Sequence, residues 1–321
     1  MDLPFGLPAV FDEDAASESG DGVPAGRILV PFGVSPESPK GRDFDSLCAE
    51  YRKKVRAFDS AGARFLLLSR QTSLADMRAA LLASRSKKLP VIACMTAGCG
   101  AGKNTFLPAL LTLQAMGASA VGLCGIPDDS MIAAVRRAVP HAAVPLAVVA
   151  DAEPGRTAAE FVQAVRPLLD AGVRLIGCGR NTAPEHLRAV RETTKKYGPP
   201  EISEEPDCYA AATEREAFFL GDDIQFSEPL PCSGSLVDKL IDLDDEQVSA
   251  ALVLVESIDD AMLLGRCASM SKLPIAVRAE SATVLDAALR YFQGRLIIDS
   301  NSCIEREVLE PLAAKYGAIV Y

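Results

Sequence analysis

Several residue types are rare in this chain of 321 residues, and each shortage narrows the class of protein to which it can belong. Tryptophan is absent, aromatic residues make up 6% of the chain, and there are two histidines. These shortages argue against an aromatic-rich β-sandwich core and leave few members for a mechanism that needs histidine. No run of about 18 uncharged apolar residues occurs, so the sequence predicts no transmembrane helix and no membrane partner.

Positive charge is also in short supply. Lysine and arginine number 33 against 43 acidic residues, which gives a net charge of −10, and the cations are scattered along the chain. A protein that binds a phosphate backbone needs clustered cations. The sequence therefore predicts no nucleic-acid partner.

The start of the chain lacks the features of a targeting signal. Residues 1–26 carry several acids, among them Asp12, Glu13 and Asp14, and no basic stretch before an apolar one. We interpret them as a disordered acidic leader. Without a signal peptide, and with nine cysteines that form no Cys-x-x-Cys pair, the chain is expected to be cytoplasmic, with reduced thiols and no zinc finger.

Short apolar segments, each followed by an amphipathic helix, fill residues 27–197. Continuous apolar runs followed by helices are typical of parallel strands that are buried on both faces. About six such units fit this region, which is fewer than the eight of a closed barrel. The predicted fold class is α/β: an incomplete or rearranged TIM-type (β/α) barrel with outer helices. Strands are expected at residues 27–32, 64–69, 89–95, 118–124, 144–150 and 173–176.

A second segment repeats the pattern. Residues 198–221 are expected to be a linker with a short helix from Ala210, and residues 222–321 to hold about four and a half further units. These units could complete the first barrel, or a partner chain could cover its open edges. Strands are expected at residues 224–226, 250–255, 273–278, 295–299 and 318–321, with helices at 258–270, 282–292 and 303–316.

One loop approaches a phosphate-binding motif. Residues 97–105, Ala-Gly-Cys-Gly-Ala-Gly-Lys-Asn-Thr, follow a predicted strand and precede a helix. In a P-loop the backbone N–H groups cradle phosphates, and Lys103 would reach the terminal ones. Ala97 replaces the first glycine and Asn104 the magnesium-binding hydroxyl. A glycine-rich loop without phosphate chemistry is the commoner explanation, and nucleotide binding remains an alternative.

The turn after residue 176 places a thiol between two glycines. Cys178 ends a predicted strand and faces a helix start, with Thr182 as the expected N-cap. Such a thiol can be stabilised as a thiolate, although a buried cysteine without chemistry is the simpler interpretation. His186 is expected to orient this turn through local hydrogen bonds, and His141, in a loop, to be solvated.

The order of these segments resembles the homocysteine S-methyltransferase family. The resemblance is to the homocysteine-binding barrel of cobalamin-dependent methionine synthase, running into the start of its pterin-binding barrel. Residues 90–96 resemble the family's PvivSMT and residues 117–124 its GvdaiGlNC. The most specific match is residues 171–187, which resemble aGvniiGGCCGTtPeHi, and residues 273–321 resemble the pterin barrel.

The resemblance implies a zinc ion held by three thiolates, which activates the homocysteine sulfur for methyl transfer. Cys124 occupies the position of the first ligand, and Cys178 lies one residue before the family's cysteine pair. Cys99 or Cys94 would have to supply the third thiolate. The pair itself aligns with Gly179 and Arg180, so a cation is expected where a thiolate belongs.

The resemblance also suggests binding positions, with several departures from the family. Substrate-binding residues would be Ser69, Thr96 and Asp151, while the catalytic residues stay unknown. In the pterin-like segment the cofactor-binding positions would be Glu228, Ser233 and Asp299, and Arg278 replaces an expected Asp. Because several pterin-contacting groups are changed together, methyltetrahydrofolate is not expected to bind.

Two functions follow from this comparison. The first is an impaired S-methyltransferase that uses zinc and acts on a small-molecule thiol. The second is a catalytically inactive homologue that serves as a partner or scaffold subunit of a methyltransferase or corrinoid protein. Either form of the protein could be a homo-oligomer.

Overall fold

The computed structural model describes most of the chain after residue 43 and two short strands before it. The described residues are 10–12, 25–28, 44–63, 65–87, 89–98, 105–198, 202–243, 248–267 and 270–321. The chain forms two compact units, residues 1–207 and residues 208–321. The boundary between them falls inside the predicted linker.

Unit 1 is an incomplete barrel of the TIM type. Its sheet is entirely parallel, in the order β2-β3-β4-β5-β6-β7-β1, so that each strand from β2 to β7 lies beside the next one along the chain. This sequential order, with a helix after each strand from β3 to β7, is the order of a barrel wall. The strands are β1 Val10–Asp12, β2 Ala25–Ile28, β3 Phe65–Gln71, β4 Val91–Thr96, β5 Ala120–Gly125, β6 Leu146–Ala150 and β7 Leu175–Cys178.

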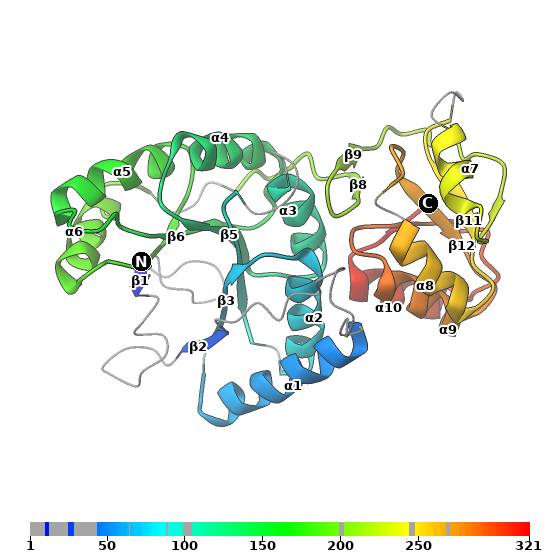
Figure 1. Ribbon diagram of the computed structural model, residues 1–321, viewed down its shortest axis with the longest axis horizontal. Coiled ribbons are helices and arrows are strands. Elements are labelled where there is room, and N and C mark those ends of the chain that lie inside the picture. The colour runs from blue at the N-terminus through cyan, green and yellow to red at the C-terminus, as the bar shows by residue number, and fades with distance from the viewer. Residues whose placement is uncertain are drawn as a thin grey trace. The chain divides into compact units, whose positions relative to one another are not determined.

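The α-helices of the described part of unit 1 follow one another around the outside of this sheet (Figure 1). Side-chain caps start several of them: Ser73 Oγ accepts from the N–H of Asp76, and Asp128 Oδ1 accepts from the N–H of Met131. The sequence predicts Ser73 as the cap of a helix that runs through Ser84, and the structure confirms both. The helices are α1 Phe44–Ser60, α2 Leu74–Ser84, α3 Phe106–Ala115, α4 Asp129–Ala138, α5 Ala158–Asp170 and α6 Pro184–Thr194.

The predicted strands of this unit are confirmed from β3 to β7. The predicted leader is wrong at Val10–Asp12, which form β1 and pair in parallel with β7. An edge strand offers unpaired backbone groups, and a short extended segment can satisfy them. The first predicted strand lies at Ala25–Ile28, while residues 29–43 are outside the described part of the chain.

The face enclosed by the unit 1 sheet is lined by strand residues. One buried cluster consists of side chains that alternate along the strands: Phe65, Leu67, Ile92, Cys94, Ala120, Cys124, Ala147, Val149 and Leu175. Successive side chains of a strand point to opposite faces. These residues therefore mark the face that the sheet encloses, and the residues between them face the helices.

Gly122 allows two strands to approach closely at this face. A Cβ built at Gly122 would lie 1.9 Å from the carbonyl oxygen of Ala147 on β6. Real side chains never come that near to a backbone oxygen, so only glycine fits here.

Unit 2 repeats the same construction on a smaller scale. Its five parallel strands follow the order β10-β11-β12-β13-β14, and they belong to a sheet separate from that of unit 1. The strands are β10 Leu230–Pro231, β11 Ala251–Leu254, β12 Ile275–Arg278, β13 Ile297–Ile298 and β14 Ile319–Val320. The helices are α7 Leu236–Asp242, α8 Ile258–Cys267, α9 Ala282–Tyr291 and α10 Arg306–Tyr316.

A β-hairpin replaces the helix that was predicted from Ala210. Its strands β8, Ala210–Ala212, and β9, Ala217–Phe219, pair antiparallel. The N–H of Ala212 donates to the carbonyl of Arg295 at 3.0 Å, and the N–H of Arg295 donates back at 2.7 Å. This pairing with a distant segment outweighs the helical preference of the alanines. Sequence reasoning also missed β10 and α7.

None of the described helices is both long enough and apolar enough to cross a bilayer.

Candidate functional site

Four of the predicted site residues meet at one end of the unit 1 sheet. Ser69, Thr96 and Cys124 lie at or near the carboxyl ends of β3, β4 and β5, and Asp151 follows β6 directly. Thr96 pairs with Cys124 and Cys124 with Val149, while Ser69 continues the alternation of Phe65 and Leu67. All four therefore belong to the enclosed face. We call this end of the enclosed face the mouth of unit 1.

Arg70 turns into the mouth because the backbone of β3 changes course there. Its φ is +58°, in the left-handed region, and the register between β3 and β4 shifts between Leu68 and Gln71. The guanidinium donates from Nη1 to Asp151 Oδ2 at 2.9 Å and from Nη2 to Oδ1 at 2.5 Å. Since β4 and β5 lie between β3 and β6 in the sheet, this ion pair spans the mouth.

The carboxylate of Asp151 has a third donor. The N–H of Arg180 donates to its Oδ1 at 2.7 Å, while the side chain of Arg180 is exposed. The expectation that Arg180 brings the cation is therefore wrong. The cation of the mouth comes from Arg70, and Arg180 contributes its backbone.

Cys124 is the thiol of the mouth. It is fully buried, and its Sγ accepts from the N–H of Arg70 at 3.3 Å. Its own S–H points to the carbonyl of Cys94, with 3.9 Å between sulfur and oxygen. Cys94 is also buried on the enclosed face, nearer the core.

Cys178 lies on the opposite face of the sheet from Cys124. It pairs with Ala150, whereas Cys124 pairs with Val149, and neighbours along a strand point to opposite sides. Cys99 is outside the described residues. Within the part of the chain that is described, no three His, Cys, Asp or Glu side chains are grouped as metal ligands. The described residues therefore do not supply the three thiolates that the family resemblance implies.

A buried network supports the turn at Arg70. The hydroxyl of Tyr51 on α1 donates to Gln71 Oε1 at 3.2 Å and to Asp76 Oδ1 at 3.0 Å, and Gln71 Nε2 donates to the carbonyl of Ser69. Burial, together with the charge of Asp76, strongly raises the pKa of Tyr51. Ser69 Oγ is buried and has no hydrogen-bond partner among the described residues.

Arg70 was missed by sequence reasoning, although one signal pointed to it. The strand Phe65–Gln71 is apolar at its start and polar at its end, and it contains one charged residue, Arg70. A charged residue in a strand that is buried along its whole length must be paired. That rule would have selected Arg70, but not Asp151 as its partner.

The turn after β7 is held mainly by His186. Its Nδ1 accepts from the N–H of Ala183 at 3.0 Å, and its Nε2 donates to the carbonyl of Arg156 at 3.0 Å. The local role expected for His186 is confirmed. Thr182 is not the N-cap, because α6 begins after Ala183 and the hydroxyl of Thr182 donates to the carbonyl of Gly179.

The equivalent end of the unit 2 sheet also carries an arginine–aspartate pair. Arg278, the last residue of β12, donates from Nε to Asp299 Oδ2 at 2.5 Å, and Asp299 is fully buried. The other carboxylate oxygen accepts two hydrogen bonds from Asn301. Of the other two predicted cofactor positions, Glu228 is exposed and Ser233 is half-buried, with its hydroxyl 3.0 Å from that of Ser235.

The phosphate-loop hypothesis falls on residues that are not described. Residues 99–104, including Lys103, lie outside the described part of the chain. The helix that follows is α3, which begins at Phe106.

The fold and the mouth together define an α/β protein with an incomplete (β/α) barrel and polar groups at the carboxyl ends of its strands. Among known families, the homocysteine S-methyltransferase model matches residues 18–194, which is more than half of the chain. The chain belongs to the homocysteine S-methyltransferase family.

The chain is similar to several known proteins. Methionine synthase of Mycobacterium leprae (strain TN) is 24% identical over 325 residues, which cover 84% of this chain and 27% of that protein. The homocysteine methyltransferase MmuM from Escherichia coli is 20% identical in its apo form, over 52% of this chain and 61% of that one, with a TM-score of 0.43. Its metallated form is 18% identical over 53% and 60%, also with a TM-score of 0.43. The chain thus spans about a quarter of the methionine synthase.

Proposed function

We propose that this chain is a homocysteine S-methyltransferase homologue that does not perform zinc-dependent methyl transfer and acts as a non-catalytic subunit of a methyltransferase or corrinoid system. The ion pair between Arg70 and Asp151 carries the proposal. The backbone N–H of Arg70 donates to Cys124, the position expected for the first zinc ligand, and the ion pair crosses the mouth in which a thiol substrate would have to sit.

The electrostatics of the mouth support this function. The backbone N–H of Arg70 donates to Cys124 Sγ, and the guanidinium of Arg70 neutralises Asp151, so the ion pair offers a divalent cation no net negative charge. Asp151 already accepts three N–H groups, so its carboxylate is committed to the protein. The side chains of Arg70 and Asp151 therefore bind each other and not a substrate.

The thiols support the same conclusion. Cys124 belongs to the enclosed face and Cys178 to the helix side. Gly179 and Arg180 occupy the positions of the family's cysteine pair, and neither can bind zinc. The apolar framework of the barrel wall is nevertheless kept, with strands from β3 to β7 that are buried along almost their whole length. A subunit that must fold but need not catalyse is expected to keep the framework and lose the site.

Unit 2 supports the proposal independently. Arg278 and Asp299 stand where the pterin barrel is expected to use Asp and Asn, and they bind each other. In both units, a carboxylate at a predicted binding position, Asp151 or Asp299, is thus engaged by an arginine.

Zinc content and methyl transfer test the catalytic half of the proposal. Purified protein would be supplied with Zn²⁺ and analysed for bound metal, and then assayed for methylation of homocysteine from methylcobalamin or methyltetrahydrofolate. We expect neither bound zinc nor activity. Stoichiometric zinc that is lost in Cys124→Ser, together with methylation of homocysteine, would instead make the chain a zinc-dependent thiol methyltransferase.

A gain-of-function variant makes the test sharper. Gly179→Cys/Arg180→Cys restores the cysteine pair of the family motif and, with Cys124, offers three thiolates. We expect this variant to acquire stoichiometric zinc and to lose it when Cys124→Ser is added. If the double variant also fails to bind zinc, the loss of the cysteine pair does not explain why this mouth lacks a zinc site.

The subunit half of the proposal needs a separate experiment. Tagged full-length protein would be purified from its own cells, and the co-purifying proteins quantified by mass spectrometry. We expect a methyltransferase or corrinoid subunit in a fixed ratio, and reassembly of the same complex from purified components. A chain that elutes alone under these conditions contradicts the proposal.

A further inference from the structure

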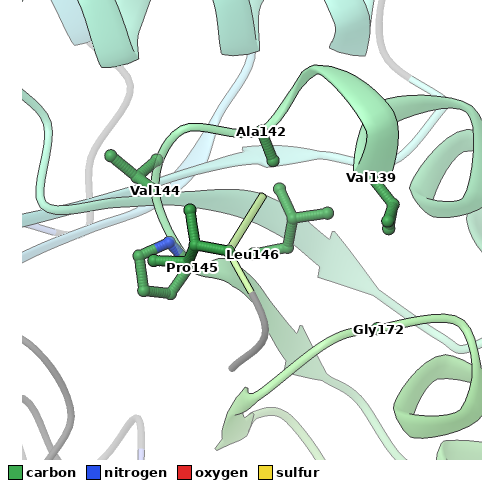
Figure 2. A pocket seen from close by; sticks show the side chains of 7 residues that line it. Val139, Ala142, Val144, Pro145, Leu146 and Gly172 are labelled. Atoms are coloured by element: carbon green, nitrogen blue, oxygen red, sulfur yellow. The ribbon is translucent and has the colours of Figure 1, made fainter. Parts of the chain in front are cut away.

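A small apolar pocket lies beside the loop that precedes β6, but no polar side chain lines it. Its wall consists of Val139, Ala142, Val144, Pro145, Leu146 and Gly172 (Figure 2), together with Ile202. A binding site needs a few polar groups to orient a ligand. His141, in the same loop, donates from Nδ1 to the carbonyl of Asp207 at 2.6 Å and is 17% exposed. The expectation that His141 is solvated is therefore wrong, and the pocket carries no binding chemistry.

The outer surface of α6 carries a ridge of cations. Arg188, Arg191 and Lys195 are exposed and follow one another after three and four residues, the spacing that aligns side chains on one face of a helix. The opposite face of α6 is the buried one, at His186 and Val190. The three cations therefore project into solvent along one line.

Two more cations widen this ridge. Lys196 follows Lys195 and is exposed, and so is Arg166 on α5. Tyr197 connects the two helices, because its hydroxyl donates to Asp170 at the end of α5 at 2.6 Å. That hydrogen bond raises the pKa of Tyr197 while the charge of Arg166 opposes the shift, so Arg166 lies near the same hydroxyl. The basic face of unit 1 consists of Arg166, Arg188, Arg191, Lys195 and Lys196.

The acids near the basic face do not neutralise it. Glu192 pairs with Lys195, both side chains being exposed, and Asp170 accepts from Tyr197. Glu185 lies at the start of α6, ahead of the ridge. Five exposed cations thus stand beside two acids, in a chain whose net charge is −10. The charge of this face is therefore opposite to that of the chain as a whole.

The helix dipole explains only part of this arrangement. Cations stabilise a helix within its last turn, which accounts for Arg191 and Lys195. Arg188 lies in the second turn of α6, and the last turn of α5 contains no basic residue, so Arg166 precedes it. The stability of the two helices therefore does not require the basic face.

We propose that the basic face of unit 1 is the docking surface for an acidic face of a partner protein. It rests on the proposed function for the identity of that partner. Arginine and tyrosine are enriched in protein interfaces, guanidinium groups bind carboxylates in a bidentate manner, and the face combines three arginines with Tyr197.

The spacing of the ridge indicates what would fit it. Between Arg188 and Lys195 the helix rises by about 10 Å, so carboxylates spaced three and four residues apart on a partner helix would match the three cations. Nucleic acid is the other ligand that a basic face can bind, and the net charge of −10 disfavours it.

Two matched variants test this surface. Arg188→Glu/Arg191→Glu reverses the charge at the centre of the ridge, and Arg52→Glu/Arg56→Glu makes the same change at two exposed arginines of α1. Each tagged full-length protein would be purified from its own cells, checked for native circular dichroism, and assayed for the methyltransferase or corrinoid subunit that accompanies it. We expect the α6 variant to lose about tenfold or more of that subunit and the α1 variant to retain it.

Cross-linking in the cell identifies the group that docks on the ridge. A photo-cross-linking amino acid would be placed at position 192, on the flank of the ridge, with position 53 on α1 as the control. We expect cross-links from position 192 alone, to an acidic segment of the same subunit. Changing the cross-linked carboxylates of the partner to lysine should restore binding to the α6 variant, because the charges again oppose one another.

The outcomes separate the docking surface from the proposed function. A complex that forms equally well with the α6 variant, or is lost equally in both variants, overturns the docking surface and leaves the proposed function standing. An acidic protein outside the methyltransferase and corrinoid systems, cross-linked at position 192 and lost in the α6 variant, supports the docking surface and contradicts the proposed function. Cross-links to nucleic acid, or to no protein at all, overturn the docking surface whatever co-purifies.

Discussion

Arg70 and Asp151 bind each other across the mouth of unit 1, although two strands of the sheet, β4 and β5, lie between the strands that carry them. Their side chains are 10% and 11% exposed. A buried ion pair adds little to the free energy of unfolding compared with two apolar residues in its place. Removing one partner, however, leaves the other charge buried and unpaired. The two residues are therefore interdependent.

This dependence can be measured. Arg70→Met leaves Asp151 without its cation and should lower the free energy of unfolding of unit 1 by about 3 kcal/mol. The double variant Arg70→Met/Asp151→Leu should recover most of that loss. Urea unfolding followed by circular dichroism gives both values. Lys195→Ala, which breaks the exposed pair of Lys195 with Glu192, is the control and should change little. Equal losses in the single and double variants would show that the pair is not coupled.

Gly122 should be indispensable to the barrel wall. In Gly122→Ala the new Cβ would meet the carbonyl oxygen of Ala147 at 1.9 Å, so β5 and β6 must separate. We expect a loss of about 3 kcal/mol or more, or failure to fold. Gly198→Ala is the matched control, since nothing lies within 4 Å of its Cβ position. A stable, fully folded Gly122→Ala protein would refute the close approach.

The regular part of the fold could be predicted because its signals are local. Strands such as Val91–Thr96 are buried on both faces, so they appear in the sequence as apolar runs. Ser73 identified the start of α2 because a cap acts over three residues. Ser69, Thr96 and Cys124 were selected by the family resemblance, and they lie together because parallel strands bring their carboxyl ends to one edge.

The parts that could not be predicted depend on distant partners. The positive φ of Arg70 and its contact with Asp151 follow from the packing of β3 against β4 and from a residue 81 positions away. Cys178 was grouped with Cys124 by the family resemblance, but the register of β7 on β6 puts them on opposite faces. The segment that begins at Ala210 was predicted to be a helix because alanine favours helices. Its pairing with Arg295 makes it a strand instead.

That pairing makes Gly294 a sensitive position in unit 2. A Cβ at Gly294 would lie 2.1 Å from the carbonyl oxygen of Ala212. Gly294→Ala should therefore detach the β8–β9 hairpin and destabilise unit 2 by about 3 kcal/mol. Hydrogen exchange of the hairpin should rise while unit 1 is unchanged. Gly221→Ala, whose Cβ position is open, should leave the hairpin protected. If both variants behave alike, the close contact at Gly294 does not hold the hairpin.

The thiols of unit 2 should differ widely in reactivity. Burial, helped by the nearby Asp260 and Cys267, raises the pKa of Cys232 to about 11. The thiolate is the reactive form, so at pH 8 only about one Cys232 in a thousand is ready to react. Cys303 is exposed. Peptide mapping after brief treatment with iodoacetamide should find Cys303 modified and Cys232 intact. Equal labelling of the folded protein would contradict this order.

The salt bridge between Asp286 and Lys315 should give unit 2 a plateau of stability between acid and alkaline pH. Burial alone would raise the pKa of Asp286, but the hydrogen bond and charge of Lys315, with Arg290 and Tyr316, lower it below the ordinary 3.8. Burial alone would lower the pKa of Lys315, but its hydrogen bonds to Asp286 and Tyr316 raise it above the ordinary 10.5. Each group is therefore charged over a wider range when folded.

The sign of the pH dependence follows from these two shifts. The lowered pKa of Asp286 gives stability that is present above pH 3.8 and is lost as the pH falls through the folded value. The raised pKa of Lys315 gives stability that is present below pH 10.5 and is lost as the pH rises through the folded value. Urea midpoints of wild-type protein and Asp286→Asn, measured from pH 2 to pH 11, should differ most on the plateau and converge in acid. A difference that stays constant down to pH 2 would show that the carboxylate charge does not stabilise unit 2.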